Sequence, residues 1–224
     1  MFLLINKPSR ITSHDVIDRV RRITGVRKVG HAGTLDPFAT GLLIVAVGRN
    51  FTKRISEFVR LDKKYRATIH FGGTSDTQDR TGTVIPAKAG IQPSQQKLEE
   101  ILKSFTGPQK QTPPMYSAKK VGGKKLYELA RQGKVIEREP NDIEIFSIEL
   151  ISYEWPIAVI DVHCTSGTYI RTLASDIGEK LGAGAYLDEL KRTAIGTYSL
   201  KHSIDLKRLS AEDLLSFEIK KEPS

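Results

Sequence analysis

The hydrophobic residues of this chain follow two patterns: runs or alternation typical of strands, and the 3.6-residue spacing typical of helices. The first part of the chain contains both. The apolar run Phe2–Ile5 predicts a short buried strand that ends in a turn at Asn6–Ser9. Thr12 or Ser13 is placed to cap the helix that follows. The apolar positions that share one face of this helix are Val16, Ile17, Val20 and Ile23.

Two more strands are predicted before residue 80. The run Leu42–Val47 is continuously apolar, which indicates a buried strand, and the residues from Lys63 to Phe71 alternate as on a strand with one buried face. A polar, glycine-rich loop follows from Gly72 to Gly82. Its carboxylates, Asp76 and Asp79, lack the spacing of a calcium-binding loop, so we interpret them as structural residues and not as metal ligands.

The second half of the chain continues in the same way. Apolar spacing from residue 98 to residue 105 predicts an amphipathic helix that ends at Gly107. Ile143–Ile151 and Ile157–Cys164 are predicted to form paired strands, and the next run, Cys164–Ala174, is predicted to turn from strand into helix.

Length and charge narrow the possible functions. The 224 residues suffice for one sizeable core and a small appendage. The formal net charge is +9, and residues 1–64 contain thirteen Lys and Arg against five Asp and Glu. A basic surface of this kind suits a polyanionic partner. The simpler interpretation is a solvated, solubilising face.

Cysteine content and hydropathy exclude several other classes of protein. The single cysteine, Cys164, excludes an internal disulfide and a cysteine-based zinc site. It has no charged activator beside it, so we interpret it as a buried strand residue and not as a nucleophile. No apolar run reaches membrane-spanning length, and Met1–Ile5 is too short for a signal peptide. We therefore expect a cytoplasmic protein without a membrane partner.

The most unusual stretch is Gly30–Gly41, which directly precedes the second apolar run. It contains three glycines, Pro37 and one carboxylate, Asp36. Glycine allows backbone conformations that other residues resist, and Pro37 fixes its own φ and disfavours helix at Asp36. Asp36 is therefore predicted to lie on a stiff loop that leads into a buried strand. The alternative is a tight turn in which Asp36 caps its own backbone.

Four separated segments carry longer motifs. They are L-L-I-N-K-P-S-R-I-T-S-H-D near the N-terminus, G-H-A-G-T-L-D-P from Gly30, Q-T-P-P-M-Y-S-A-K-K from Gln111 and C-T-S-G-T-Y-I-R-T-L from Cys164. Together they resemble the TruB family of pseudouridine synthases, which modify the T-loop uridine of tRNA. The resemblance runs collinearly from residue 2 to about residue 200. The chain departs from the family pattern at Asn50-Phe51, where a small residue is usual, and at Lys119, where an apolar residue is usual.

The resemblance implies an α+β fold, with a mixed, largely antiparallel sheet flanked by helices and loops. It implies a catalytic domain over residues 1–205, followed by a short C-terminal helix and tail at 206–224. Ser210–Asp213 form a plausible capping box for that helix. Many bacterial relatives continue into a small RNA-binding PUA domain, which we do not expect here.

The resemblance also implies three catalytic residues. Asp36 occupies the position of the catalytic carboxylate, Tyr65 that of the tyrosine that stacks on the target uracil, and Arg171 that of the arginine that pairs with the carboxylate. From the residues alone, the more common interpretations are a core residue for Tyr65 and a surface residue for Arg171.

Five further residues are implied in substrate binding. His31 is placed either to wedge into the space left by the extruded base or to hydrogen-bond within its loop. Tyr169 corresponds to a tyrosine beside the target base, and Leu190 to a leucine that lines the uracil pocket. Lys53 belongs to a Thr-Lys pair that the family keeps, and Asp79 to a loop that orders the active site or orients RNA.

The implied reaction breaks the C1′–N1 bond of a uridine, rotates the uracil and joins C5 to C1′. Neither a redox step nor a group transfer is needed, so no cofactor or metal is expected. Three roles for Asp36 remain open: addition to C1′, addition to the uracil ring, or removal of a proton to give a glycal. The expected partner is the T-arm of tRNA; no protein partner is implied, and we expect a monomer.

Two other classes of function remain. A tRNA-binding or chaperone protein on the same fold needs only the basic surface and would tolerate replacement of Asp36. A guide-RNA-dependent pseudouridine synthase subunit shares the G-H-x-G-T-L-D-P core, but that type relies on a PUA domain to hold its guide.

Overall fold

The computed structural model describes residues 1–87, 92–117, 119–130 and 132–210. The chain divides into two compact units: unit 1 comprises Met1–Tyr65 and Leu190–Ser224, and unit 2 comprises Arg66–Glu189. Two strands, β4 (Lys63–Phe71) and β12 (Ala185–Ile195), contribute residues to both units. The predicted C-terminal helix, with all but the first residue of its capping box, lies outside the described residues.

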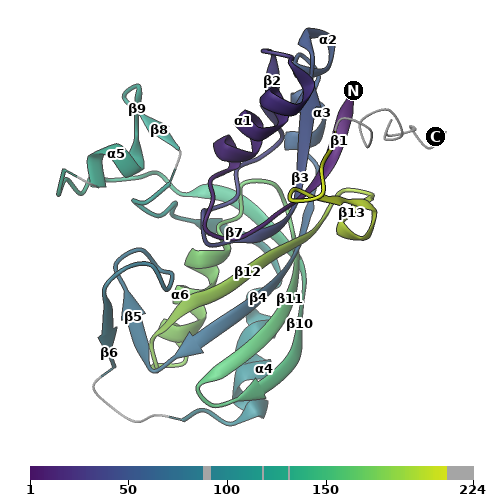
Figure 1. The fold of residues 1–224 in the computed structure, drawn as a ribbon. Coiled ribbons are helices and arrows are strands. Elements are labelled where there is room, and N and C mark those ends of the chain that lie inside the picture. Colours follow the sequence, from purple (N-terminus) through teal and green to yellow (C-terminus); the bar gives the residue numbers. More distant parts are fainter. Residues whose placement is uncertain (88–91, 118, 131, 211–224) are drawn as a thin grey trace. The chain divides into compact units, whose positions relative to one another are not determined.

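Unit 1 consists of short strands with helices beside them (Figure 1). Its elements, besides its parts of β4 and β12, are β1 (Phe2–Lys7), α1 (Ser13–Thr24), β2 (Val29–His31), β3 (Thr40–Val47), α2 (Arg49–Thr52), α3 (Ile55–Val59), β13 (Tyr198–Ser199), a 3₁₀ helix (Leu200–His202) and β14 (Ile204–Asp205). The strand order is β14-β1-β3-β12, with β2 paired to β3 and β13 to β12. The β1–β14 and β3–β12 pairs are parallel, and the other pairs in this unit are antiparallel.

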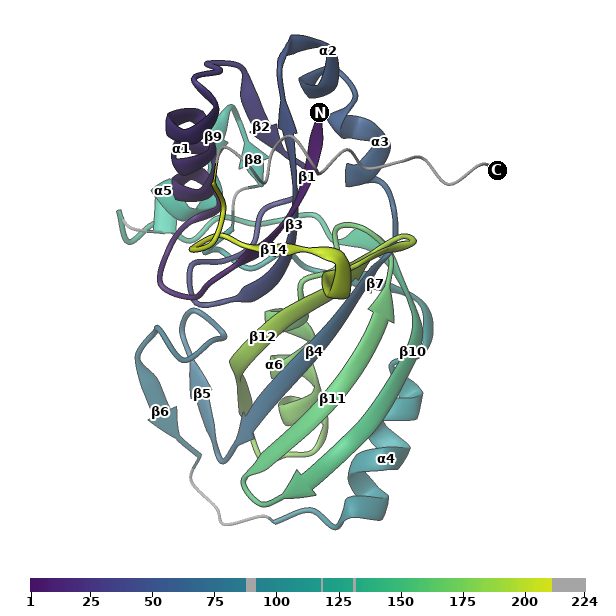
Figure 2. The ribbon, with the colours of Figure 1, turned by 45° about the vertical axis from the view of Figure 1, so that its right-hand side comes forward.

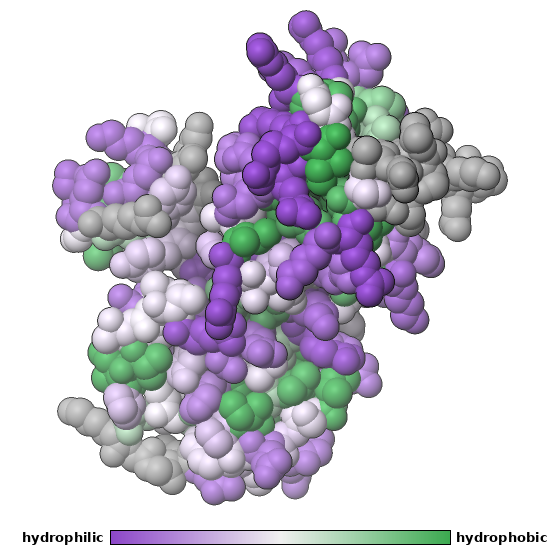
Figure 3. All heavy atoms as spheres, in the orientation of Figure 1, coloured by the Kyte–Doolittle hydropathy of each residue, from purple (hydrophilic) through white to green (hydrophobic). Residues whose placement is uncertain are grey.

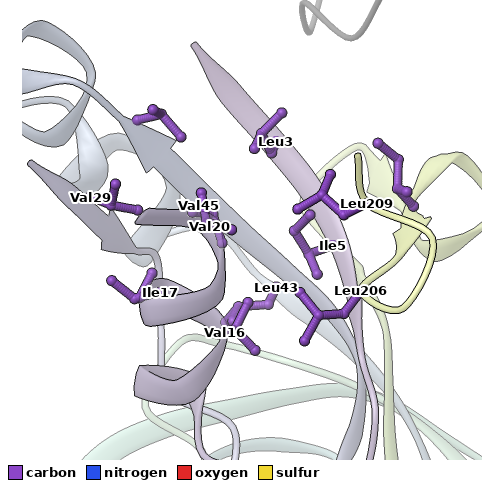
Figure 4. Packing of buried hydrophobic residues seen from close by; sticks show 12 residues of the cluster. Leu3, Ile5, Val16, Ile17, Val20, Val29, Leu43, Val45, Leu206 and Leu209 are labelled. Carbon is purple, nitrogen blue, oxygen red and sulfur yellow. The ribbon is translucent and has the colours of Figure 1, made fainter. Parts of the chain in front are cut away.

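The predicted N-terminal helix is confirmed as α1. Thr12 is its N-cap: the Thr12 hydroxyl accepts from Asp15 N at 3.0 Å, and the Asp15 carboxylate accepts from Thr12 N at 2.7 Å, which completes a capping box. The apolar face of α1 packs on β1 and β3, as Figure 4 shows. The buried residues of this cluster that the figure labels are Leu3, Ile5, Val16, Ile17, Val20, Val29, Leu43, Val45, Leu206 and Leu209.

Two boundaries in unit 1 differ from the sequence prediction. Asn6 and Lys7, predicted as part of a turn, continue β1 and pair with Leu42 and Gly41 of β3. The apolar run ends at Ile5, so the sequence carries no signal that a lysine continues the strand and is buried there. The glycine-rich stretch is a loop only from residue 32 to residue 39, because its two ends belong to β2 and β3.

Unit 2 contains a larger sheet with the order β12-β4-β11-β10-β7, together with two small hairpins. Its elements are β5 (Gly73–Ser75), β6 (Val84–Pro86), α4 (Gln95–Ser104), β7 (Gly107–Gln111), β8 (Lys120–Val121), β9 (Lys124–Lys125), α5 (Leu126–Ala130), β10 (Asn141–Glu154), β11 (Ile157–Cys164) and α6 (Ile170–Lys180). Both α4 and α6 lie on one side of this sheet (Figures 1 and 2). Alternate residues of β4 and β11 are buried, and Cys164 is fully buried among them, as predicted.

The α+β class is thus confirmed, with a mixed sheet in which most pairs are antiparallel. Within the described part of the chain, no helix combines the length and the apolar composition needed to cross a bilayer.

Gly178 gives a test of the packing between α6 and β12. Inside a helix, alanine is normally more stable than glycine by about 1 kcal/mol. A Cβ at Gly178 would lie 2.2 Å from Ala185 N, because the Gly178 carbonyl accepts from Ala183 N and Gly184 N and draws that turn against the helix. We expect Gly178→Ala to lower the free energy of unfolding by about 1–3 kcal/mol, measured by urea denaturation.

The control is Glu179→Ala at the exposed neighbouring position, which should stay within about 0.5 kcal/mol of the wild type. If Gly178→Ala is as stable as the wild type, the close approach of α6 to Ala185 is wrong.

Candidate active site

Asp36 lies half-buried in the loop of residues 32–39, here called the Asp36 loop. The backbone is held on both sides of it. Leu35 N donates to Ser13 Oγ at 2.9 Å, and Ser13 Oγ donates to Leu35 O at 3.1 Å. On the other side, Pro37 O accepts from Arg10 N at 2.8 Å. The loop is therefore fixed around the carboxylate, as expected of a stiff loop.

Lys7 adds a buried positive charge beneath this loop. Its ammonium donates to Pro8 O at 2.9 Å, Ile11 O at 2.8 Å and Pro37 O at 3.4 Å. Burial lowers the pKa of Lys7 to about 8, while the nearby charge of Asp36 acts in the opposite direction. The ammonium remains mostly charged at pH 7 and favours the ionised form of Asp36.

Arg192 holds the start of the Asp36 loop from β12. Its side chain is almost fully buried, and it donates from Nε to Leu42 O at 2.8 Å and from Nη2 to Gly33 O at 3.1 Å. Gly33 has a φ of +88°, in the region that favours glycine. At Gly41, also with positive φ, a Cβ would lie 2.3 Å from Arg192 O, because β3 and β12 pair closely at this point. The structure thus explains why two of the three positions in the motif, Gly33 and Gly41, are glycine.

His31 lies half-buried on β2. Burial, with the nearby charge of Arg192, lowers the pKa of the imidazole below its usual value, so the ring is uncharged at neutral pH. Its Nδ1 is buried and has no hydrogen-bond partner within the part of the chain that the structure describes.

The remaining predicted residues of unit 1 are Tyr65, Leu190 and Lys53. Tyr65 is half-buried on β4, two residues after the buried Lys63, whose ammonium donates to the carbonyls of Val59 and Leu61 and so fixes the start of the strand. Leu190 is buried on β12. Lys53 is exposed at the C-terminal end of α2.

In unit 2, Arg171 is buried, with 4% of its surface exposed, so the interpretation as a surface arginine is wrong. Its guanidinium donates from Nη1 to Thr77 O at 2.8 Å and from Nη2 to Tyr116 O at 2.7 Å, and Nη1 lies 3.4 Å from Asp79 Oδ2. One side chain at the start of α6 thus joins three segments of unit 2.

Asp79 is also buried and belongs to a compact polar loop. Its Oδ1 accepts from Thr77 Oγ1 and from Thr81 N, both at 2.9 Å. A Cβ at Gly82 would lie 2.1 Å from Asp76 Oδ1, so the loop closes only around glycine. These contacts make Asp79 a partner that orients Arg171. The described residues contain no group of three or more His, Cys, Asp and Glu side chains arranged for a metal ion.

Of the predicted site residues, the structure brings Asp79 and Arg171 together, with Tyr169 two residues before Arg171 at the N-terminus of α6. Three polar residues that support the Asp36 loop were missed by sequence reasoning: Lys7, Ser13 and Arg192. Lys7 and Ser13 lie inside the N-terminal motif, and Arg192 lies outside the four motifs. Their partners in the loop are distant in sequence, and no local pattern indicates such contacts.

The fold of this chain is similar to that of a solved structure. A chain in a crystal structure of a Cbf5–Nop10–Gar1 complex matches with a TM-score of 0.72 and 27% identity, over 92% of this chain and 52% of that one. The present chain therefore spans about half the length of that protein.

Sequence comparison identifies the class and then the family. The family model described as "TruB family pseudouridylate synthase (N terminal domain)" matches residues 21–170, and that described as "tRNA pseudouridylate synthase B C-terminal domain" matches residues 171–221. The fold and these matches define a pseudouridylate synthase. Within that class, the chain belongs to the TruB family.

Curated relatives agree with this assignment. The protein named tRNA pseudouridine synthase B from Geobacter sulfurreducens is 48% identical over 93% of this chain and 68% of its own length. The protein of the same name from Protochlamydia amoebophila is 46% identical over 91% of this chain and 77% of its own length.

Lys7 provides a pH-dependent test of the support beneath Asp36. Its pKa is about 8 in the folded protein, against 10.5 for an unperturbed lysine. Between pH 8 and pH 10.5, Lys7 binds more protons in the unfolded chain than in the folded protein. The contribution of Lys7 to the free energy of unfolding therefore rises with pH, by at most about 1.4 kcal/mol per pH unit. We expect the stability difference between wild type and Lys7→Met to shift in favour of the wild type by about 2 kcal/mol from pH 8 to pH 10, measured by urea denaturation.

The control is Lys53→Met, at an exposed lysine of the same unit. If the stability difference for Lys7→Met changes with pH no more than that for Lys53→Met, burial does not lower the pKa of Lys7.

Proposed function

We propose that this chain isomerises uridine 55 in the T loop of tRNA to pseudouridine. The observation that carries the proposal is the position of Asp36 within G-H-A-G-T-L-D-P, on a loop whose backbone is fixed on both sides of the carboxylate. The names of the relatives that are 46–48% identical support tRNA as the substrate. In this proposal, residues 1–205 act as the catalytic domain.

Asp36 is the reacting group in this proposal. The C1′–N1 bond breaks, the uracil rotates, C5 bonds to C1′ and the proton on C5 leaves. A carboxylate suits this sequence because it attacks carbon or stabilises a cationic sugar, and the charge of Lys7 favours its ionised form. Attack on C1′, attack on the ring and proton removal all begin from this same ionised carboxylate.

Arg171 and Tyr65 act on the same uridine. Arg171 pairs with the ionised Asp36, and the carbonyls of Thr77 and Tyr116 fix the direction of its guanidinium. Tyr65 stacks on the extruded uracil, and its phenolic oxygen accepts the C5 proton in the last step as its own proton is released, while N1 gains a proton.

The substrate-binding residues then receive the flipped base. The uncharged ring of His31 wedges into the space that the base leaves, while Tyr169 and Leu190 lie beside the uracil. Lys53 contacts the RNA from its exposed position at the end of α2, whereas the buried Asp79 acts on the site through Arg171.

The exposed basic residues of unit 1 support an RNA partner. Hydrophilic side chains gather over α1 in Figure 3, and Arg22, Arg27 and Lys28 are exposed at or just beyond its C-terminal end. Arg19 and Arg21 are partly engaged, with Leu206 O and with the Asp18 carboxylate. Arg22, Arg27 and Lys28 are therefore the residues that we propose to contact RNA phosphates, because their side chains are exposed. Action in the cytoplasm, as a monomer, stays a prediction.

Replacement of Asp36 tests the proposed function. We expect Asp36→Asn and Asp36→Ala to reduce pseudouridine formation to below a few per cent of wild type, with tRNA affinity nearly unchanged, because no other residue of the Asp36 loop carries a carboxylate. Unmodified tRNA is incubated with each variant, and pseudouridine is mapped at single-nucleotide resolution. The control is Asp142→Asn, at an exposed carboxylate on β10, which should retain wild-type activity.

Turnover by the Asp36 variants would refute the catalytic assignment. If the wild type binds tRNA but modifies no uridine, the non-catalytic tRNA-binding function replaces it.

Arg171→Lys tests the second catalytic assignment. Lysine keeps the charge but loses the planar fork that serves two carbonyls and a carboxylate at once. We expect the single-turnover rate to fall roughly tenfold or more, which corresponds to about 1.4 kcal/mol of transition-state stabilisation.

The matched control is Arg66→Lys. Arg66 also contacts a carboxylate with two nitrogens, at 2.8 and 2.7 Å from Asp161, but the pair is exposed. Its rate should stay within about twofold of wild type, since exposed pairs contribute little. Equal rates for wild type and Arg171→Lys would show that the fork of Arg171 is not needed.

A further inference from the structure

Gln111, at the end of β7, contacts both backbone groups of a residue 58 positions later. Tyr169 N donates to Gln111 Oε1 at 2.8 Å, and Gln111 Nε2 donates to Tyr169 O at 3.0 Å. The side chain of Gln111 is buried, with 4% of the residue exposed. Only one orientation of the amide satisfies both hydrogen bonds, because one end must accept and the other must donate.

These two bonds fix the start of α6. Tyr169 is the N-cap of that helix, and its own side chain makes no capping hydrogen bond within the described residues. Its carbonyl also accepts from Leu173 N at 3.0 Å, the first hydrogen bond of the helix. Gln111 therefore sets the backbone from which Tyr169 and Arg171 project.

The contact is reciprocal. The chain that follows Gln111 passes through the buried Pro113-Pro114 to Tyr116, whose carbonyl accepts from Arg171 Nη2 at 2.7 Å. Each segment thus sends one side chain to the backbone of the other: Gln111 binds Tyr169, and Arg171 binds Tyr116. A displacement of either segment breaks hydrogen bonds of buried groups, which are costly to leave unsatisfied.

We propose that Gln111 is a positioning residue for pseudouridine formation, and that it acts by holding the N-terminus of α6 so that Arg171 and Tyr169 keep their orientation. The proposal rests on the proposed function. Gln111 does not act on the uridine itself, because both ends of its amide are used by the Tyr169 backbone.

Gln111→Glu turns this contact into a pH-dependent one. The protonated carboxyl accepts from Tyr169 N and donates to Tyr169 O, as the amide does, whereas the carboxylate cannot donate and faces the carbonyl oxygen. We expect the ratio of variant to wild-type single-turnover rate to be near one at low pH and to fall at least tenfold as the pH rises. The tRNA concentration for half-maximal rate should change less than threefold.

The matched control is Gln109→Glu, two residues earlier on β7. Its amide donates to Phe105 O, at the C-terminal end of α4. Its rate ratio should stay flat over the same pH range.

A second readout needs no activity. Gln111→Leu removes the acceptor of Tyr169 N, so the exchange of this amide with deuterium, followed by NMR, should become at least tenfold faster, while amides of β10 and β11 keep their rates. If the wild type forms no pseudouridine, the proposed function fails and the exchange result alone decides whether Gln111 holds α6.

Three results would overturn the role of Gln111. The first is an active wild type with a rate ratio for Gln111→Glu that does not change with pH. The second is an unchanged exchange rate of the Tyr169 amide in Gln111→Leu. The third is loss of the folded state in both Gln111→Glu and Gln111→Leu, measured by near-UV circular dichroism. The last would mean that Gln111 serves the fold as a whole.

Discussion

Asp36 has a defined position because polar side chains buried beneath it hold the backbone on either side. Ser13 takes both backbone groups of Leu35, and the ammonium of Lys7 reaches the carbonyl of Pro37. A shift of the loop would leave a buried donor without an acceptor, at a cost of about 1–3 kcal/mol for a neutral group and more for a charged one. These hydrogen bonds therefore add to the packing of the buried loop residues Leu35 and Phe38 in holding the loop.

In unit 2, hydrogen bonds between buried polar groups also hold separate segments together, here around the guanidinium of Arg171. Arg171 would be unfavourable in its buried position without the two carbonyls and the Asp79 carboxylate that receive its donors. The amide of Gln111 in turn satisfies the backbone at the start of α6. In both units, a polar side chain supplied by one segment fixes the backbone of another, and the residues assigned to the chemistry project from those fixed segments.

This rigidity matters for the proposed reaction. A base must leave its stack before it can react, which costs about a few kcal/mol. In the proposed function, the binding of RNA phosphates by the exposed residues Arg22, Arg27 and Lys28 offsets that cost. Groups that are already oriented add no further entropic cost when the base arrives. The carboxylate of Asp36 meets this condition although it lies on a loop, because hydrogen bonds hold the backbone at Leu35 and at Pro37.

The sequence by itself determined the elements whose signals are local. The helix near residue 13 follows from a capping residue, Thr12 or Ser13, and a 3.6-residue apolar period. The strands Leu42–Val47 and Ile157–Cys164 follow from their apolar patterns. The motif around Asp36 indicated the family, which the family models confirm. Each of these signals lies within about a dozen consecutive residues.

The tertiary structure alone decided which polar residues are buried and what they bind. Lys7 continues a strand that the apolar pattern ends two residues earlier. Arg171, which lies off the apolar stripe of its helix, is bound by two other segments, the loop with Thr77 and Asp79 and the segment at Tyr116. Gln111 and Arg192 meet their backbone partners across 58 and more than 100 residues. A hydrogen bond between segments so far apart leaves no periodic trace in either one, because it depends on where the fold places their backbones and not on the residues beside them.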